Sequence, residues 1–254
     1  GVIRTVCGDV PADSVGHCQC HEHLFISKGR SFEHNSALWM DDVARSTLEL
    51  VDYYKAGGRL VVDAQPVFFG RMAEALIKAS VMSNVHIVAS TGFHKMIFCE
   101  NESFFLSNEV EALSSFFVNE VTTGMHSSNG DRLTGCAGIM KVALEKGGIK
   151  STSLREKLFR AGAVAAKNTG VPILIHMESE VDAFEVIRLY EEYDIDSSKL
   201  IFCHMDRTHQ DAGYHHEVLS MGAYLNYDSI HRYKYISDEQ ERKLILSVLG
   251  NGYG

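Results

Sequence analysis

Seven short apolar segments alternate along this chain with stretches of helical pattern, and that alternation restricts the fold more than any other feature of the sequence. The segments are continuously apolar, as at residues 60–64 and 85–89, rather than alternately apolar and polar. Continuous runs of this kind are typical of parallel strands that helices cover on both faces. The sequence therefore predicts an α/β fold with a parallel sheet.

The expected elements follow one another without a Pro- or Ser-rich linker, so we predict a single domain over residues 1–254. This length is typical of a (β/α)8 TIM barrel, which runs to about 250 residues. After an extended piece at 2–6, strands are expected at about 17–25, 60–64, 85–89, 138–143, 172–176, 200–204 and 223–228. Helices are expected at about 41–56, 71–82, 104–122, 154–168, 181–193 and 217–220, with a last one from about 237.

Composition and charge exclude several classes of partner. The formal net charge is -9, which argues against a nucleic-acid partner because Lys and Arg are what hold phosphate backbones. No apolar run approaches the ~20 residues of a membrane span, so we expect no membrane partner. A small-molecule substrate fits better.

The six cysteines are scattered, and most lie in or beside apolar runs where cysteine behaves as a small hydrophobe. We interpret them as reduced and the protein as cytoplasmic. Cys18 and Cys20 beside His17 are a weaker candidate for a zinc site, because no second thiolate pair follows at finger-like spacing.

Polar residues recur at one place in successive strand–helix units, which is the end of the strand. They are His21 and His23 in the first unit, Lys141 in the fourth, His176 in the fifth and His204 in the sixth. The spacing of His21 and His23 puts both on one face of a strand, and the strand ends of a barrel meet at one mouth. Each residue alone is equally explained as a structural histidine or as a lysine that extends its amine to solvent. Together they predict a polynuclear metal site.

Short motifs surround these residues. They are Ile3-x-Thr5-Val6-x-Gly8, Gly16, His21-Glu22-His23-Leu24, the strand with Lys141, Gly170-Val171-Pro172-x-x-x-His176 and Cys203-His204-x-Asp206. In order and approximate spacing, over essentially the whole chain, they resemble the phosphotriesterase family of the amidohydrolase superfamily, which includes the phosphotriesterase-like lactonases. The resemblance is specific for the family and weak on the substrate.

This resemblance implies a distorted (β/α)8 barrel with two divalent metal ions, usually zinc. His21 and His23 would hold the more buried ion, and His176 and His204 the more exposed one. Lys141, carbamylated by CO2, would bridge the two, since a carbamate turns this cation into a carboxylate. Two ions ~3.5–4 Å apart lower the pKa of a bridging water, so hydroxide is available near neutral pH.

The implied reaction is hydrolysis of an ester-like bond. Members of the family divide among organophosphate triesters, lactones and phosphorylated sugar lactones. The triesterase activity tends to be a promiscuous extra there, so a lactone is the favoured substrate. A homodimer is a common assembly in that family.

Basic residues follow several strand ends in an otherwise acidic chain. Arg and Lys are the usual phosphate ligands, so a role in substrate binding is one interpretation of Lys28, Arg207, Arg232 and Lys234. Solvated loop charge explains them equally well. We expect Asp206 to orient a ligand imidazole.

Aromatic residues follow the third strand, where family members place side chains that shape the pocket. They are Phe93, His94 and Phe98, and the sequence assigns them no roles.

An aspartate that the resemblance implies is missing. It lies on the eighth strand of the family's barrel, ligates the buried ion and takes the proton from the attacking water, but here the sequence stops at Gly254 without such a strand. Asp228 is the best substitute, although we expect its position to lie away from the buried ion. Seven strands would leave the edges of strands one and seven unpaired. We therefore predict that the full protein continues beyond Gly254.

Two other classes of function remain open. A metal-dependent nuclease with a similar start would be favoured by Glu in place of Lys141 and by a basic surface, and this sequence has neither. A non-catalytic or impaired relative that keeps the barrel and binds a ligand is the alternative to a hydrolase. A protein that retains no zinc after purification without chelator would support the binding alternative.

Overall fold

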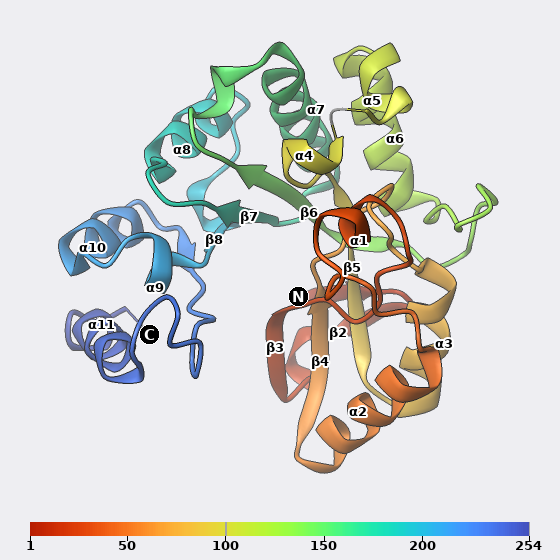
Figure 1. Ribbon diagram of the computed structural model, residues 1–254, viewed down its shortest axis with the longest axis horizontal. Helices are drawn as coiled ribbons and strands as arrows, with labels where there is room; N and C mark the ends of the chain where they lie inside the picture. The colour runs from red at the N-terminus through yellow and green to blue at the C-terminus, as the bar shows by residue number, and fades with distance from the viewer. Residues whose placement is uncertain (100, 254) are drawn as a thin grey trace.

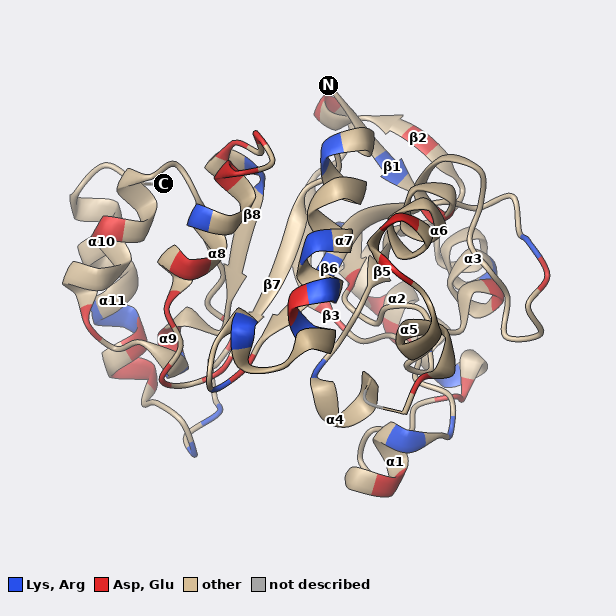
Figure 2. Cartoon of the chain, turned by 90° about the horizontal axis from the view of Figure 1, so that it is seen from above, with Lys and Arg blue, Asp and Glu red and all other residues tan. Residues whose placement is uncertain are grey.

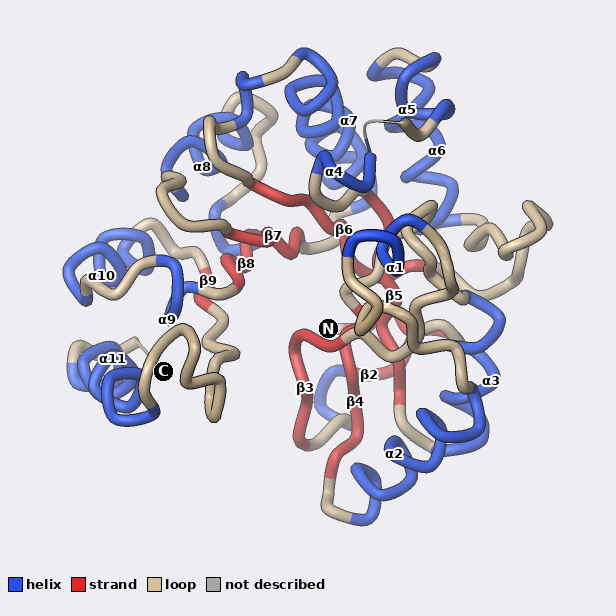
Figure 3. Tube along the Cα trace, in the orientation of Figure 1, coloured by secondary structure: helices blue, strands red, loops and turns tan. Residues whose placement is uncertain are grey.

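A curled parallel sheet forms the centre of the computed structural model, which describes residues 1–99 and 101–253 (Figure 1). Its strands lie side by side in sequence order, and every neighbouring pair is parallel. They are β3 (His17–Glu22), β4 (Gly58–Asp63), β5 (His86–Gly92), β6 (Ala137–Leu144), β7 (Ile173–Met177), β8 (Leu200–Cys203) and β9 (Tyr224–Leu225). Within the described residues β3 and β9 each pair on one side only, so the arc is open between them (Figure 3).

Helices follow the strands along the chain, and the longer ones lie outside this arc (Figures 1 and 3). They are α1 (Arg30–His34), α2 (Val43–Lys55), α3 (Ala73–Ser83), α4 (Met96–Cys99), α5 (Ser103–Ser107), α6 (Val110–Thr122), α7 (Ser153–Thr169), α8 (Ala183–Glu191), α9 (Met205–Thr208), α10 (Ala212–Ser220) and α11 (Asp238–Gly250), with short 3-10 turns at Ala12–Ser14, Ile149–Ser151 and Ser197–Lys199. Acidic and basic residues are interspersed over the outer helices (Figure 2). Among the described residues no helix combines the length and the apolar character that crossing a membrane requires.

Local sequence explains where these helices begin and end. At α7 the Thr152 side chain accepts a hydrogen bond from the Arg155 amide, and Gly170 ends the helix with a φ of 72°. At α11 Ser237 and Gln240 form a reciprocal capping box. Both helices therefore carry their own boundary signals.

A small cluster of buried apolar side chains lies in the barrel interior. It consists of Leu60, Ala64, Val88, Ile139, Leu174 and Cys203, and it is separate from the larger core between sheet and helices. Because side chains two residues apart share a face of a strand, Lys141 lies on the same inner face as Ile139, and His176 on that of Leu174. The inner face thus changes from apolar to polar toward the strand ends.

A two-stranded hairpin packs against the other ends of the central strands. It is formed by β1 (Val2–Thr5) and β2 (Gly8–Pro11), which pair antiparallel. The amide of Val6 donates to the Ile87 carbonyl at 2.8 Å, and Gly138 leaves no room for a Cβ beside the Arg4 carbonyl. This end of the barrel is closed by packing, so the polar end is the one that can admit a substrate.

The seven expected strands are confirmed, but some boundaries differ. The helix expected at 104–122 is two helices, because Asn108 ends α5 and its side chain donates to the Phe104 carbonyl at 2.8 Å. Lys141 does not end its strand, since β6 continues to Leu144. The strand expected at 223–228 is limited to Tyr224–Leu225; the Asn226 amide still donates to the Phe202 carbonyl at 2.8 Å, but the Asp206 carboxylate accepts from the amides of Asp228 and Ser229.

Candidate active site

Five imidazoles form a closed ring at the polar end of the barrel. Their centroid separations are 5.7 Å for His23–His21, 4.9 Å for His21–His204, 4.6 Å for His204–His176, 5.6 Å for His176–His94 and 6.2 Å for His94–His23. Four of the five are the histidines that the sequence predicted, and the structure brings them together. The fifth, His94, had been assigned no role, because its position in the loop after β5 gives no spacing signal.

The backbone positions these rings in different ways. His21 lies in β3 and His176 in β7, whereas His23 follows the end of β3. His204 follows β8 and precedes α9 in the left-handed region, with a φ of 64°. A non-glycine residue in this region is uncommon and is often found at functional sites, because the surrounding structure must hold it there.

Lys141 is fully buried beside the group of five histidines. Its side chain is 0% exposed, and its Nζ has no hydrogen-bond partner within the part of the chain that the structure describes. Burial lowers the pKa of Lys141, and the positive charge of Lys141 in turn helps to lower the pKa of all five histidines. A buried amine without a partner is costly, and such a group calls for a specific explanation.

The main chain of the neighbouring strand packs closely against that of Lys141. Gly92 pairs with Lys141 across β5 and β6, and the Phe93 amide donates to the Lys141 carbonyl at 3.0 Å. Gly92 has a φ of 110°, and a Cβ at that position would lie 2.1 Å from the same carbonyl oxygen. Only glycine fits here, so the position of Lys141 is fixed by the main chain.

Asp228 joins the imidazoles, contrary to the expectation that it lies away from the buried ligands. Its Oδ2 is 2.5 Å from His204 Nδ1 and 3.6 Å from His21 Nδ1. One ligand atom from each of these three residues can lie within 4.8 Å of the other two, which is a spacing suited to a metal ion. Asp206 was expected to orient an imidazole, but none of its hydrogen bonds to the described residues involves one. Asp206 instead accepts from the amides of Asp228 and Ser229 at 3.0 and 2.7 Å and so aims Asp228.

Gln65 is a second residue that the sequence did not reveal. Its Oε1 lies 2.7 Å from His23 Nδ1, and its side-chain amide nitrogen donates to the Phe69 carbonyl. Burial lowers the pKa of His23 to about 4 even though this contact with Gln65 opposes the shift. Asp63, on the same strand end, accepts from the Leu24 and Gln65 amides, and its burial raises its pKa to about 7. No alternation or spacing rule marks such supports, because they act through the loop after β4.

A cavity of about 430 Å³ opens beside His176. Three cations line it, namely Lys95, Lys146 and Arg207. Lys95 and Lys146 are paired with Glu178 and Glu180, whereas Nη1 of Arg207 is buried without a hydrogen-bond partner among the described residues. The cavity therefore places a guanidinium N–H that is free to donate near His176.

Tyr235, which also lines this cavity, gathers the predicted cations. Arg207, Arg232 and Lys234 lie 4.6, 5.2 and 4.7 Å from the centre of its ring. Burial alone would raise the pKa of Tyr235, but the three cations outweigh it and lower that pKa. Arg207 and Tyr235 line the cavity, and Arg232 and Lys234 lie against the same tyrosine ring.

Lys28 is not part of this group. It lies over the rings of Phe32 and Trp39, at 4.7 and 4.8 Å, and lines a different cavity of about 260 Å³. The two cavities share no lining residue among those described.

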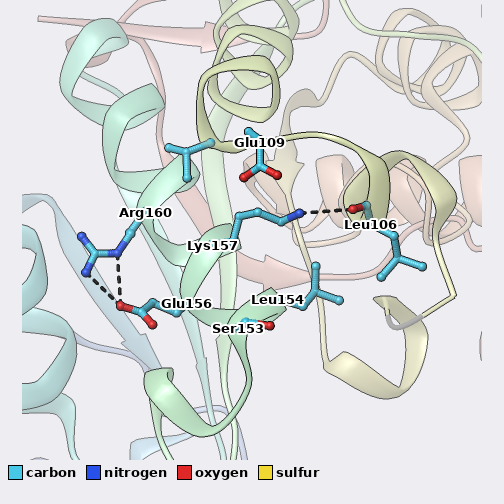
Figure 4. Close-up of a pocket in the computed structure, with 8 residues that line it drawn as sticks. Leu106, Glu109, Ser153, Leu154, Glu156, Lys157 and Arg160 are labelled. Atoms are coloured by element: carbon cyan, nitrogen blue, oxygen red, sulfur yellow. Dashed lines mark hydrogen bonds and ion pairs between the residues drawn. The ribbon is translucent and has the colours of Figure 1, made fainter.

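Another cavity, of about 450 Å³, lies among α5, α6 and α7 on the outside of the barrel (Figure 4). Lys157 crosses it to donate to the Leu106 carbonyl at 3.4 Å, and Arg160 pairs with Glu156 at 2.8 Å (Figure 4). Its cations already have protein partners, and none of the five imidazoles lines it.

Comparison with known proteins places this site in a family. The model of the phosphotriesterase family matches residues 1–254. A phospho-furanose lactonase of Mycoplasmopsis agalactiae is 29% identical over 244 residues, which cover 93% of this chain and 69% of that protein. An N-acetyltaurine hydrolase of Danio rerio is 28% identical over 258 residues, with 90% and 71% covered. A crystal structure of a lactonase from Listeria monocytogenes matches with a TM-score of 0.90 and 28% identity, covering 100% of this chain and 80% of that one. The chain belongs to the phosphotriesterase family.

Proposed function

We propose that this protein is a metal-dependent hydrolase that opens a lactone carrying a phosphate. One observation supports this above all: the group of five imidazoles, with Lys141 and Asp228, borders through His176 on a cavity that is also lined by Arg207, whose Nη1 has no hydrogen-bond partner among the described residues. The name of the lactonase relative describes a substrate with a cyclic ester and a phosphate. Organophosphate triester hydrolysis would be a side activity of the same centre.

The residues present fit two divalent metal ions. His21 Nδ1, Lys141 Nζ and Asp228 Oδ1 are buried without a hydrogen-bond partner among the described residues, as atoms reserved for an ion would be, and Asp228 Oδ2 lies 2.5 Å from His204 Nδ1. His21 and His23 with Asp228 would hold one ion, and His176 and His204 the other. Imidazole and carboxylate ligands suit zinc. When bound, such ions lower the pKa of a water molecule and polarise the carbonyl under attack.

Lys141 would complete this set as a carbamate. Its burial favours the neutral amine, which is the form that attacks CO2. The nitrogen forms a bond to the carbon of CO2 and releases one proton, and the product is an anionic carboxylate. Lys141 would thereby supply an anionic carboxylate ligand in place of a buried amine.

Asp228 is the carboxylate best placed to take a proton at this mouth. Its Oδ2 lies 2.5 Å from His204 Nδ1, so a proton accepted there can be held between the two groups. Because Asp206 fixes the backbone amide of Asp228, the carboxylate is positioned before substrate arrives.

The phosphate would bind among Arg207, Arg232 and Lys234. A charge-assisted hydrogen bond contributes roughly 1.5–3 kcal/mol, which corresponds to about a tenfold to hundredfold change in binding. Replacing Arg207, Arg232 or Lys234 by Ala should therefore raise KM for a phosphorylated furanose lactone by such factors, with the largest effect at Arg207. Lys28→Ala serves as the matched control, since Lys28 lines the other cavity.

Steady-state kinetics with phosphorylated and unphosphorylated lactones provides the test. Equal effects of the three variants on both substrates would contradict phosphate binding at this cluster. Hydrolysis of an acyl amide bearing a sulfonate, in place of any lactone, would instead assign the protein the chemistry named for the Danio rerio relative. Zinc retention without hydrolysis of either substrate would favour the ligand-binding alternative.

A further inference from the structure

The hydrogen bonds at His94 define its tautomer. The backbone amide of Lys95 donates to His94 Nδ1 at 2.8 Å. The Nδ1 lone pair is therefore occupied and the ring is neutral, so its single proton lies on Nε2. With a proton on Nε2 and an amide on Nδ1, this imidazole has no lone pair left for a metal ion.

The neighbouring ring has the opposite arrangement. His23 Nδ1 faces Oε1 of Gln65, an acceptor, because the amide nitrogen of Gln65 is used on the Phe69 carbonyl. The proton of His23 is thus on Nδ1, and its Nε2 lone pair is free to ligate. His23 and His94 are stacked at 6.2 Å with an interplanar angle of 18°, yet His23 has a free lone pair on Nε2 whereas His94 has a proton there.

His94 is also held rigidly beside both predicted metal pairs. Its ring lies 6.2 Å from that of His23 and 5.6 Å from that of His176, and Phe98 packs edge-on against it at 5.3 Å. The loop is anchored on its other side by Glu145, whose Oε2 accepts from the Met96 amide at 2.7 Å. Among the described residues no hydrogen-bond partner is found for His94 Nε2.

We propose that His94 is a catalytic residue that donates a hydrogen bond from Nε2 to the substrate carbonyl oxygen on which negative charge develops. The inference rests on the proposed hydrolase function and adds to it a protein donor that is not a metal ligand. A preorganised donor of this kind is stronger in the transition state than in the ground state, so it acts on kcat. The proton stays on nitrogen throughout.

Two variants separate donation from packing. His94→Phe keeps an aromatic ring but removes the donor, and should lower kcat by about a hundredfold, the loss seen when one oxyanion donor is removed. His94→Gln restores an N–H near the position of Nε2 and should recover most of that loss. The matched control is His34→Phe, because the exposed His34 packs against the same Phe98 at 5.7 Å but lies outside the imidazole ring. Bound zinc should be unchanged in all three.

Nitrogen NMR of the metal-free protein gives an independent readout. Long-range ¹H–¹⁵N correlations should show the proton on Nε2 in His94 and on Nδ1 in His23, and the reverse assignment would overturn the proposal. Loss of zinc in His94→Phe would make His94 a ligand instead. A wild-type kcat in His94→Phe would refute this inference alone, whereas a wild-type protein that hydrolyses no lactone or amide would refute the proposed function as well.

Discussion

Replacing Lys141 by Met should stabilise the metal-free protein while it removes hydrolysis. Lys141 is 0% exposed and its amine has no hydrogen-bond partner in residues 1–99 and 101–253, and a buried group left in that state costs about 1–3 kcal/mol. Met has a similar length and no polar atom, so this cost should be recovered. For a domain of this size the gain is a rise in Tm of about 2–4 °C per kcal/mol.

The pH dependence has a defined sign. Because burial lowers the pKa of Lys141 below its ordinary 10.5, the folded protein holds this proton less tightly than the unfolded chain. The cost of the charge is complete below the folded-state pKa and disappears as the pH rises through the interval up to 10.5. The advantage of Lys141→Met should therefore shrink as the pH approaches 10.5.

The assay is urea unfolding with chelator in CO2-free buffer, at neutral pH and near pH 10.5. Lys55→Met is the control, since Lys55 is 69% exposed and its removal should change stability by less than about 0.5 kcal/mol. A Lys141→Met protein that is no more stable than this control would refute the account of Lys141 as an amine kept unpaired for function.

Two further predictions concern residues that support the site, and a third concerns the buried ion pair between Arg71 and Glu120. Gln65→Leu should weaken zinc binding by about 10–100-fold, measured by competition with a chelator, and unchanged affinity would remove Gln65 from this role. Gly92→Ala should destabilise by more than Gly57→Ala in denaturant unfolding, because both have positive φ but only the Cβ at Gly92 meets a backbone oxygen; equal losses would disprove the close approach. Glu120→Gln should lower the free energy of unfolding by about 3–5 kcal/mol, because it leaves the buried guanidinium of Arg71 without a negatively charged partner. Burial alone would raise the pKa of Glu120, but the nearby Arg71 outweighs burial, so the pKa is lowered on folding. The stability that this ion pair gives the wild type should therefore disappear as the pH falls through the folded-state pKa. A stability difference between wild type and Glu120→Gln that does not change with pH would contradict this.

The strands could be predicted because each is a continuous apolar run flanked by helical pattern. Likewise, His21, His176, His204 and Lys141 lie on or beside strands, so the barrel geometry alone brings them to one mouth. The boundaries of helices and strands were less predictable where a side chain forms a hydrogen bond with a backbone group. Asn108 divides an apolar helical stretch in two, and Asp206 accepts from the amides of Asp228 and Ser229, which follow the last strand.

The residues that the sequence did not reveal lie in loops and act through single contacts. His94 and Gln65 are defined by which nitrogen or oxygen of a neighbour they face, and no periodicity encodes that. Asp228 was expected away from the buried ligands, and the turn held by Asp206 moves it to them. Lys28 follows a strand end as Arg207 does, but the rings of Phe32 and Trp39 hold it elsewhere.

Zinc titration of the metal-depleted protein tests the central claim most directly. Hydrolysis of a phosphorylated furanose lactone and bound zinc per chain should be measured together, with CO2 present. The account predicts activity that rises until two zinc ions are bound. It also predicts that Lys141→Ala is inactive and is partly restored by a short-chain carboxylic acid when bicarbonate is withheld. Hydrolysis that does not depend on zinc, or full activity and metal content in Lys141→Ala, would contradict the account.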